Sequence, residues 1–247
     1  MATYDTRAIV IKTQDYKESD KIVWLFSEKL GKISVIAKGA KKNRSKLFSN
    51  TLSFCYGNYV IYKGKGMYTL NEGEIIDSFQ NLLDDLETIT YASYFCELID
   101  IAMTEEESNR ELFKDFISAF YFMKNKVGDL ETLSRIFELK VLNATGYGLN
   151  LDKCCICRNK LNSSTYMSLQ YLGGICENCE RINGINISNA TYNILRYLNN
   201  LPLEKSYRVT IPDGLKEEIY KVLNTIISQN YFKKPKSLET LNFLKGS

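Results

Sequence analysis

The hydrophobic pattern of the chain changes its period near residue 80. Before that point, β-branched and aromatic residues gather in five short runs separated by turn residues, which is typical of β-strands. The expected strands cover residues 7–13, 21–27, 31–37, 56–63 and 67–76. Gly31 and the KGKG run at 63–66 supply tight turns. Five strands in so short a segment predict a small barrel of the OB-fold type.

After residue 80 the apolar positions recur every three or four residues, which predicts amphipathic helices. Three stripes mark the first helices: Ala92, Phe95, Ile99 and Ala102; Phe113, Phe116, Phe120 and Met123; and Leu130, Leu133, Phe137 and Val141. Ser108 and Asn109 offer an N-cap for the second helix, while Gly146 and Gly148 end the third. Two more stripes predict the remaining helices: Ile194, Leu195 and Leu198 after Ser188, then Leu215, Ile219, Val222 and Ile226 after Pro212, which opens the last one.

The predicted fold class is therefore α+β. We expect an N-terminal five-stranded OB-fold barrel at 1–80, followed by an α-helical domain at 81–247. Neither an internal repeat nor a low-complexity linker interrupts the chain, which favours two domains that pack on each other.

Two CxxC pairs separated by eighteen residues stand within the helical region. Cys154 with Cys157, and Cys176 with Cys179, can place four thiolates around one tetrahedral zinc ion. Four cysteines leave no coordination position open for water, so we expect a structural zinc, one per chain, in an inserted module at about 150–185. A hairpin at 166–175, with glycines 173 and 174 at its tip, would join the two pairs.

The alternative interpretation is that these are ordinary buried thiols of a reduced protein. Five of the seven cysteines fall within 26 residues, which favours the metal. Cys155 could compete as a ligand, but the two-residue gap favours its neighbours. Cys55 and Cys96 lie in apolar surroundings and are expected to be core residues.

The chain contains no histidine, which excludes most side-chain catalysis near neutral pH. Neither a Ser-His-Asp triad nor a Cys-His pair can form. The phosphate-binding pattern GxxxxGK[ST] is also absent, so a nucleotide-driven motor is not expected. Metal nucleases that use carboxylates stay open as a class, although the scattered Asp and Glu residues mark no site.

Charge is distributed unevenly along the chain. Residues 1–80 carry 13 basic and 8 acidic residues, residues 81–153 carry 7 and 14, and residues 154–247 carry 12 and 7, so the net charges are +5, −7 and +5. Two basic segments that flank an acidic one indicate modules that bind different partners. Only the two basic segments carry the charge needed to bind a polyanion. No apolar run approaches the roughly eighteen residues that span a bilayer, so we expect no membrane contact and a cytoplasmic location.

The basic charge of the barrel is concentrated in one loop. Residues 38–46 carry five cations and no acid: Lys38, Lys41, Lys42, Arg44 and Lys46. We expect this loop to contact the phosphates of a nucleic acid, with Lys12, Lys17, Lys21 and Lys32 as the next candidates. Because most of these cations are lysines, which do not read guanine in a bidentate manner, binding should depend little on base sequence.

Four aromatic residues near this loop are candidates for stacking on bases: Trp24, Phe26, Phe48 and Tyr56. Aromatic residues in short strands are more often part of the core, so each is expected to pack rather than to stack.

Several motifs carry a family resemblance. The run RAIVIKTxDYxESDK at 7–21, LGKI at 30–33 and AKGAKK at 37–42 resemble the start of the bacterial RecO recombination and repair proteins. FELKVLxxxGY at 137–147, LDxCxxC at 151–157 and GxCxxC at 174–179 are similar to the helix and zinc motif of that family. The resemblance spans the chain from the barrel to the last helix, in an order that is hard to reproduce by chance. All four zinc-ligand positions are occupied here, although not every family member keeps them.

This resemblance implies a DNA repair and recombination mediator without enzymatic turnover, associated with the nucleoid. Such proteins bind single- and double-stranded DNA and anneal complementary strands. They engage the acidic C-terminal tail of the single-stranded-DNA-binding protein, and they work with RecR to load RecA on gaps. The resemblance alone implies these protein partners.

Two other classes of function share some of these features. An RNA-binding or transcription-associated OB and zinc-knuckle module would have the same basic surface but would prefer RNA through its 2′-hydroxyl. A thiol redox enzyme would use a CxxC pair, but it needs a thioredoxin-like βαβ context, which does not precede Cys154.

Overall fold

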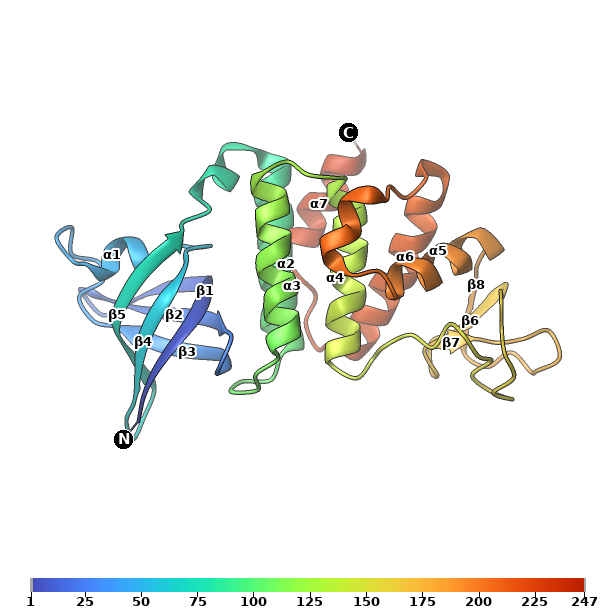
Figure 1. The fold of residues 1–247 in the computed structure, drawn as a ribbon, viewed down its shortest axis with the longest axis horizontal. Coiled ribbons are helices and arrows are strands. Elements are labelled where there is room, and N and C mark those ends of the chain that lie inside the picture. The colour runs from blue at the N-terminus through green and yellow to red at the C-terminus, as the bar shows by residue number, and fades with distance from the viewer. Residues whose placement is uncertain (1, 247) are drawn as a thin grey trace. The chain divides into compact units, whose positions relative to one another are not determined.

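The computed structural model describes residues 2–246, with side chains described as far as Leu241 (Figure 1). Two compact units divide the chain. The first unit comprises residues up to Asn125 together with those from Pro235 onward, and the second comprises Lys126–Lys234.

The first unit begins with the expected barrel, whose strands are β1 (Ala2–Tyr16), β2 (Asp20–Ser27), β3 (Gly31–Ala37), β4 (Tyr56–Lys63) and β5 (Tyr68–Asp77). The closed order is β1-β2-β3-β5-β4, in which only the β3·β5 pair is parallel. A short helix, α1 (Leu47–Asn50), lies between β3 and β4 in the chain. This strand order, with a helix after the third strand, confirms the predicted OB-fold class.

The first strand is much longer than the predicted 7–13, because it pairs with two neighbours. Ala2 to Ile9 pair with β4, and Ala8 to Tyr16 pair with β2. A shift of register between Val10 and Lys12 bends the strand between these partners. Polar residues at both ends concealed this length from the hydrophobic pattern.

Alternate residues of the strands fill the barrel. The buried cluster comprises Ala8, Val10, Val23, Leu25, Ile33, Val35, Ala37, Ala40, Cys55, Tyr59, Ile61, Tyr68 and Leu70. Tyr59 is fully buried among them, and its hydroxyl donates to the backbone oxygens of Asn50 and Cys55 at 2.9 and 3.2 Å. A buried phenol is tolerated only with such partners.

Four helical segments complete the first unit: η1 (Gln80–Asp84), α2 (Leu86–Ala102), α3 (Arg110–Lys124) and α7 (Ser237–Gly246). Asn109 caps α3 as expected, since its side chain accepts from the N–H of Leu112 at 2.9 Å. Phe26 of β2 packs edge-on against Phe113 and Phe116 of α3, with ring centroids 5.6 Å apart in each pair.

The prediction that the helix after Pro212 is the last one was wrong. α7 follows it and packs on α2, with Leu238 and Leu241 buried. The helix is only ten residues long, too short for a convincing hydrophobic period. Its start was nevertheless marked by Pro235 and Ser237, which are residue types found at helix N-termini.

The second unit contains α4 (Leu130–Ala144), α5 (Asn189–Asn199), η2 (Leu203–Arg208) and α6 (Asp213–Asn230), with a small sheet of β6 (Tyr166–Ser168), β7 (Gly173–Gly174) and β8 (Gly184–Asn186). Ser188 caps α5 as predicted by accepting from the N–H of Thr191 at 3.1 Å. Gly146, at φ +85°, follows the end of α4.

The sequence suggested that glycines 173 and 174 form the tip of a hairpin, and this prediction was wrong. They form strand β7 itself, which pairs with Met167 and Ser168. A Cβ at Gly174 would lie 2.5 Å from the Tyr192 hydroxyl, so this glycine allows close packing rather than a turn.

The expected boundary at residue 80 separates strands from helices along the chain, whereas the compact units divide after Asn125 and before Pro235. The reason is that α2, α3 and α7 belong to the unit that contains the barrel. The division into an OB-fold domain at 1–80 and a helical domain at 81–247 therefore stays a prediction. No helix in the described part of the chain has the length and apolar character needed to cross a membrane.

A glycine at the first position of β3 provides a test of the packing in the first unit. Gly31 has φ +66°, and a Cβ there would lie 2.0 Å from the backbone oxygen of Glu107. We expect Gly31→Ala to lower the free energy of unfolding by at least about 2 kcal/mol, since both strain and overlap with backbone oppose it. Gly66→Ala is the matched control, because nothing lies within 4 Å of its Cβ position. Chemical denaturation measures both, and equal stabilities would contradict this packing.

Candidate metal centre and candidate nucleic-acid interface

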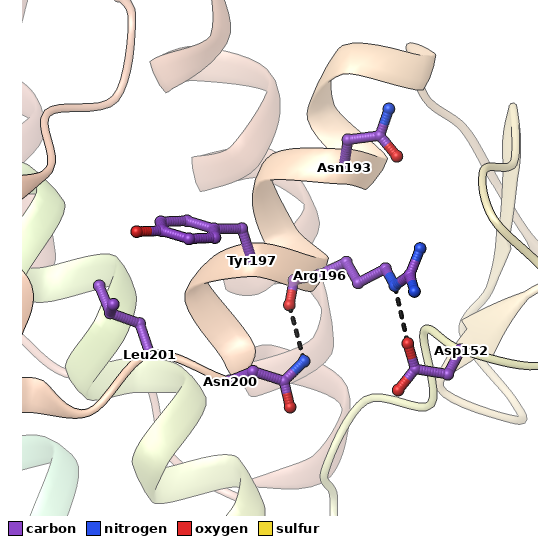
Figure 2. A pocket seen from close by; sticks show the side chains of 6 residues that line it. All are labelled: Asp152, Asn193, Arg196, Tyr197, Asn200 and Leu201. Carbon is purple, nitrogen blue, oxygen red and sulfur yellow. Dashed lines mark hydrogen bonds and ion pairs between the residues drawn. The ribbon is translucent and has the colours of Figure 1, made fainter.

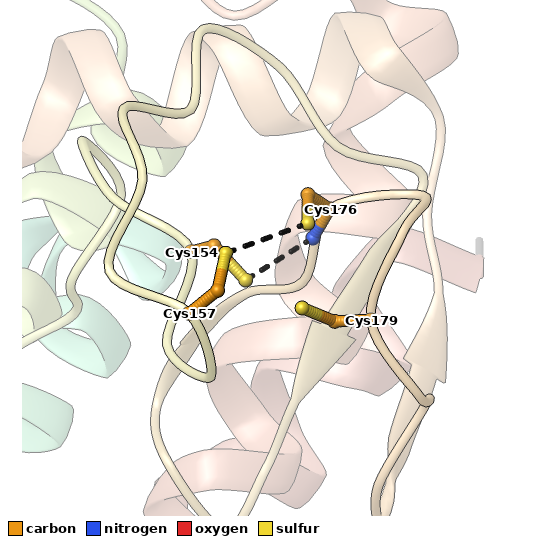
Figure 3. Close-up of side chains that lie close together, drawn as sticks. All are labelled: Cys154, Cys157, Cys176 and Cys179. Carbon is orange, nitrogen blue, oxygen red and sulfur yellow. Dashed lines mark hydrogen bonds between the residues drawn. The ribbon is translucent and has the colours of Figure 1, made fainter.

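The four predicted cysteines meet in the second unit (Figure 3). Cys154 and Cys157 lie after α4, and Cys176 and Cys179 follow β7. All four sulfur atoms lie within 4.8 Å of one another. The sequence therefore predicted the membership of this cluster correctly.

Backbone hydrogen bonds fold each pair into a tight turn. The N–H of Arg158 donates to the oxygen of Cys154 at 3.0 Å, and the N–H of Cys179 donates to that of Cys176 at 3.2 Å. The two turns are joined because the N–H of Cys176 donates to the sulfur of Cys154 at 3.4 Å. The cluster is thus built from local turns rather than from regular strands.

The spacing of the sulfurs fits a tetrahedral metal ion. Thiolates lie about 2.3 Å from such an ion, which separates the sulfurs by about 3.8 Å. The sulfurs of Cys157 and Cys176 are 3.8 Å apart. This set of four thiols can therefore hold a metal ion.

The ionisation of the thiols supports the same conclusion. Burial raises the pKa of Cys154, but N–H groups of Cys176, Cys157 and Ile156 outweigh it and lower that pKa to about 6. Hydrogen bonding to Cys176 and burial raise the pKa of Cys179 to about 12. Four adjacent thiolates repel one another, so full ionisation of the cluster needs a cation at its centre.

The other three cysteines lie apart from this cluster. The thiol of Cys155 is directed to the backbone oxygen of Gly173 at 3.7 Å, and burial raises its pKa. Cys55 and Cys96 are buried, and desolvation likewise raises the pKa of each. Cys55 belongs to the barrel core and Cys96 to α2, as their surroundings in the sequence predicted.

The basic loop lies between β3 and α1, at the surface of the barrel. Lys38, Lys42, Arg44 and Lys46 are exposed. Lys41 is half-buried, and its ammonium group lies 3.0 Å from the carboxylate of Asp15. Four of the five cations are therefore free of any described ion pair and available to phosphate.

Hydrogen bonds hold the base of this loop on the β1–β2 turn. The N–H of Gly39 donates to Asp20 at 2.8 Å, and the N–H of Lys41 donates to the oxygen of Ser19 at 2.9 Å. The bond from Gly39 is the main reason that the pKa of Asp20 is lowered. Because Lys17 lies in the same turn, it is brought to the same end of the barrel as the loop.

Two of the four aromatic candidates remain accessible. Trp24 is half-buried, with the ammonium of Lys12 4.6 Å from its ring centroid. Phe48 is exposed, and the ammonium of Lys21 lies 5.7 Å from its ring. Phe26 and Tyr56 are buried, as expected for core residues. Trp24 and Phe48 thus each combine a ring with a cation on the outside of the barrel.

Lys32 was a poor candidate for binding nucleic acid. Its side chain is buried, and its ammonium group donates to the backbone oxygen of Asp100 at 2.5 Å. It also lies 3.6 Å from the Asp100 carboxylate. Lys32 therefore links β3 to α2, which a strand pattern alone could not reveal.

Sequence reasoning overlooked one exposed cation. Lys65 lies in the β4–β5 turn, where the KGKG run was interpreted only as a turn signal. In OB-folds the β1–β2 and β4–β5 loops border the binding face. Lys63, in the same run, is 2.6 Å from Glu106 and is therefore paired.

A pocket of about 400 Å³ lies beside α5 in the second unit (Figure 2). Its lining residues are Asp152, Asn193, Arg196, Tyr197, Asn200 and Leu201. Arg196 lies 2.7 Å from Asp152 and also donates to the oxygen of Asn162 at 3.2 Å. The charge of this arginine is already balanced, so the pocket offers an anion little attraction.

Two family models match adjoining parts of this chain. The model described as "Recombination protein O N terminal" matches residues 1–79, and that described as "Recombination protein O C terminal" matches residues 83–239. The chain belongs to the recombination protein O family. The first match covers the barrel, and the second covers the cysteine cluster and most of the helices.

Whole-length relatives agree with the two models. A protein named DNA repair protein RecO from Clostridium novyi is 56% identical over 247 residues, covering 100% of this chain and 96% of its own. One of the same name from Clostridium acetobutylicum is 58% identical over 245 residues, covering 99% of each. A third, from Acetivibrio thermocellus, is 31% identical over 244 residues, covering 97% of this chain and 95% of its own.

Proposed function

We propose that this protein is a mediator of homologous recombination in DNA repair, which binds single- and double-stranded DNA and anneals complementary strands. The observation that carries the proposal is the basic loop hydrogen-bonded to the β1–β2 turn of an OB barrel. Its free cations lie at one end of the barrel, near the part that OB-folds use for oligonucleotides. The family membership directs this surface towards DNA.

The DNA-contacting residues in this proposal are Lys38, Lys41, Lys42, Arg44, Lys46, Lys12, Lys17 and Lys21, with Lys65 added. Lys41 should contribute less than its neighbours, because Asp15 already balances its charge. Lysines act on phosphate as point charges, so the surface should bind DNA of any sequence.

Annealing requires no chemical step in this proposal. Two DNA strands repel because both are polyanions, and a basic surface that neutralises both backbones lets base pairing supply the driving force. The absence of histidine and of a phosphate-binding glycine loop supports a protein without enzymatic turnover.

The protein partners in this proposal come from the family resemblance. They are RecR, the acidic C-terminal tail of the single-stranded-DNA-binding protein, and RecA, which is loaded indirectly. A cytoplasmic, nucleoid-associated location goes with these partners. The α5 pocket fits the acidic tail poorly, because Asp152 already neutralises Arg196.

Zinc is the ion proposed for the four-cysteine cluster. It accepts four thiolates in a closed tetrahedral shell, and the sulfur spacing fits that shell. Cys154, Cys157, Cys176 and Cys179 would hold the ion, which serves folding and leaves no position for water or substrate. A thiol redox centre, in contrast, would leave reactive thiols and no stoichiometric metal.

Metal analysis of the native protein tests the zinc site. We expect one zinc per chain, and serine at Cys154 or Cys179 should remove it and lower the unfolding temperature by several degrees. Acid should release the ion, because protons compete for the thiolates. Cys155→Ala is the control and should retain full zinc. Protein purified without chelator that holds well under one zinc per chain would exclude the site.

Salt-dependent binding tests the basic loop. Glutamate at Lys38, Lys41 and Lys42 should weaken binding to every DNA sequence while folding is preserved. Glutamine at the same three positions should flatten the slope of log affinity against log salt by at most roughly 2 for single strands, because the paired Lys41 contributes less than the other two. Lys29→Gln removes a charge elsewhere on the barrel, where Lys29 bonds the oxygen of Asp5, and should change little. An unchanged slope in the triple variant would place the DNA elsewhere.

Strand annealing tests the mediator function. Complementary strands, bare or coated with the cognate single-stranded-DNA-binding protein, should anneal faster with this protein and without nucleotide, and high salt should suppress the effect. Strands coated with a single-stranded-DNA-binding protein that lacks its acidic C-terminal tail should anneal poorly, because the tail is proposed to recruit this protein. If the protein binds DNA tightly at low salt but accelerates annealing of neither bare nor coated strands, it is a passive DNA-binding module and not a mediator.

Competition between matched DNA and RNA strands tests the alternative function, an RNA-binding or transcription-associated module. A recombination mediator should bind DNA at least as tightly as RNA. A clear preference for RNA would favour the RNA-binding module, because only contacts to the 2′-hydroxyl distinguish the two.

A further inference from the structure

A short exposed segment between α6 and α7 stands out in the second unit. Phe232, Lys233 and Lys234 are all exposed, and Phe232 shows its whole side chain to solvent. None of the other large apolar residues described as exposed reaches two-thirds of full exposure. Packing within the chain gives no account of this phenylalanine.

The segment is held in place rather than left loose on its N-terminal side. Tyr231 is buried, its hydroxyl lies 2.6 Å from that of Thr145, and its ring packs edge-on against Tyr147 with centroids 5.7 Å apart. Burial raises the pKa of Tyr231 to about 12, so this phenol remains neutral and keeps the bond. On the other side, Pro235 is buried. Two buried residues therefore border the three exposed ones.

The charged residues that surround this segment in the sequence are all basic. Residues 219–238 contain four lysines and no acidic residue. Lys233 and Lys234 directly follow the exposed ring, and no described ion pair includes either lysine. An aromatic ring beside unpaired cations is the combination that binds a base and its phosphates together.

We propose that Phe232, with Lys233 and Lys234, forms a second contact for single-stranded DNA outside the barrel, in which the ring stacks on one base and the lysines neutralise neighbouring phosphates. The inference rests on the proposed function of this protein in binding DNA. A single ring can serve one base, whereas a protein interface needs several hundred square ångströms of surface on each partner. Two adjacent lysines also suit a polyanion better than an apolar partner surface.

The contact predicts a difference between single strands and duplexes. Bases in a duplex are already stacked, so Phe232 can help only where bases are unpaired. In full-length protein, Phe232→Ala should weaken binding of a short oligothymidylate by roughly tenfold, and binding of a duplex of equal length much less. Fluorescence anisotropy at fixed salt measures both affinities.

Side-chain and salt controls separate stacking from other causes. Phe232→Trp should retain affinity, whereas Phe232→Leu should lose it almost as fully as Phe232→Ala, because leucine is apolar but cannot stack. Phe232→Ala should leave the salt slope unchanged, and glutamine at both Lys233 and Lys234 should lower it by roughly 1.4. Tyr171→Ala, another exposed aromatic of this unit, should change nothing.

Three results would overturn this second contact: unchanged binding of single strands by Phe232→Ala, full affinity of Phe232→Leu, or equal losses on single strands and duplexes. The full affinity of Phe232→Leu would indicate an apolar partner instead. The basic-loop variants report separately on the proposed function. If they lose binding while Phe232→Ala does not, the barrel binds DNA and only the second contact is wrong.

Discussion

The parallel pairing of β3 with β5 is the constraint on which the barrel and its candidate DNA surface depend. Only two residue pairs close the barrel here, Val35 with Tyr68 and Ile36 with Thr69. Because β5 lies between β3 and β4 in the closed order, β3 and β4 are not neighbours and cannot be joined by a tight hairpin turn, so the chain travels through residues 38–55 before it starts β4. The basic loop is part of that connection.

This connection explains how one segment can be both anchored and charged. Ala40 is buried in the barrel core, and Leu47 packs against that core. Between them lie Lys42 and Arg44, whose side chains remain exposed. Small or apolar residues anchor the loop to the barrel on either side of its exposed cations, so the loop can keep one conformation. Less conformational entropy is therefore lost when the loop binds a phosphate chain.

The sequence predicted those parts of the molecule that depend on local pattern. The five strands, the caps at Asn109 and Ser188, and the four-cysteine cluster all follow from short-range signals, and the structure has them. It did not predict what depends on contacts between distant segments. Lys32 looked like its neighbours in a basic barrel, but its buried side chain pairs with the half-buried Asp100, 68 residues away. The accessibility of Phe232 gave no sequence signal either, since an exposed and a buried phenylalanine look alike in a sequence.

The small sheet beside the four-cysteine cluster gives a physical reason for a bound metal ion there. The strands β6, β7 and β8 contain three, two and three residues, far fewer than a sheet needs for stability of its own. The backbone from Asn150 to Asn186 therefore relies on links other than a ladder of hydrogen bonds. A metal ion bound by Cys154, Cys157, Cys176 and Cys179 would supply such a link, because it ties the two CxxC turns directly to each other. A closed shell of four thiolates suits that task, since stability here needs a cross-link and gains nothing from an open coordination site.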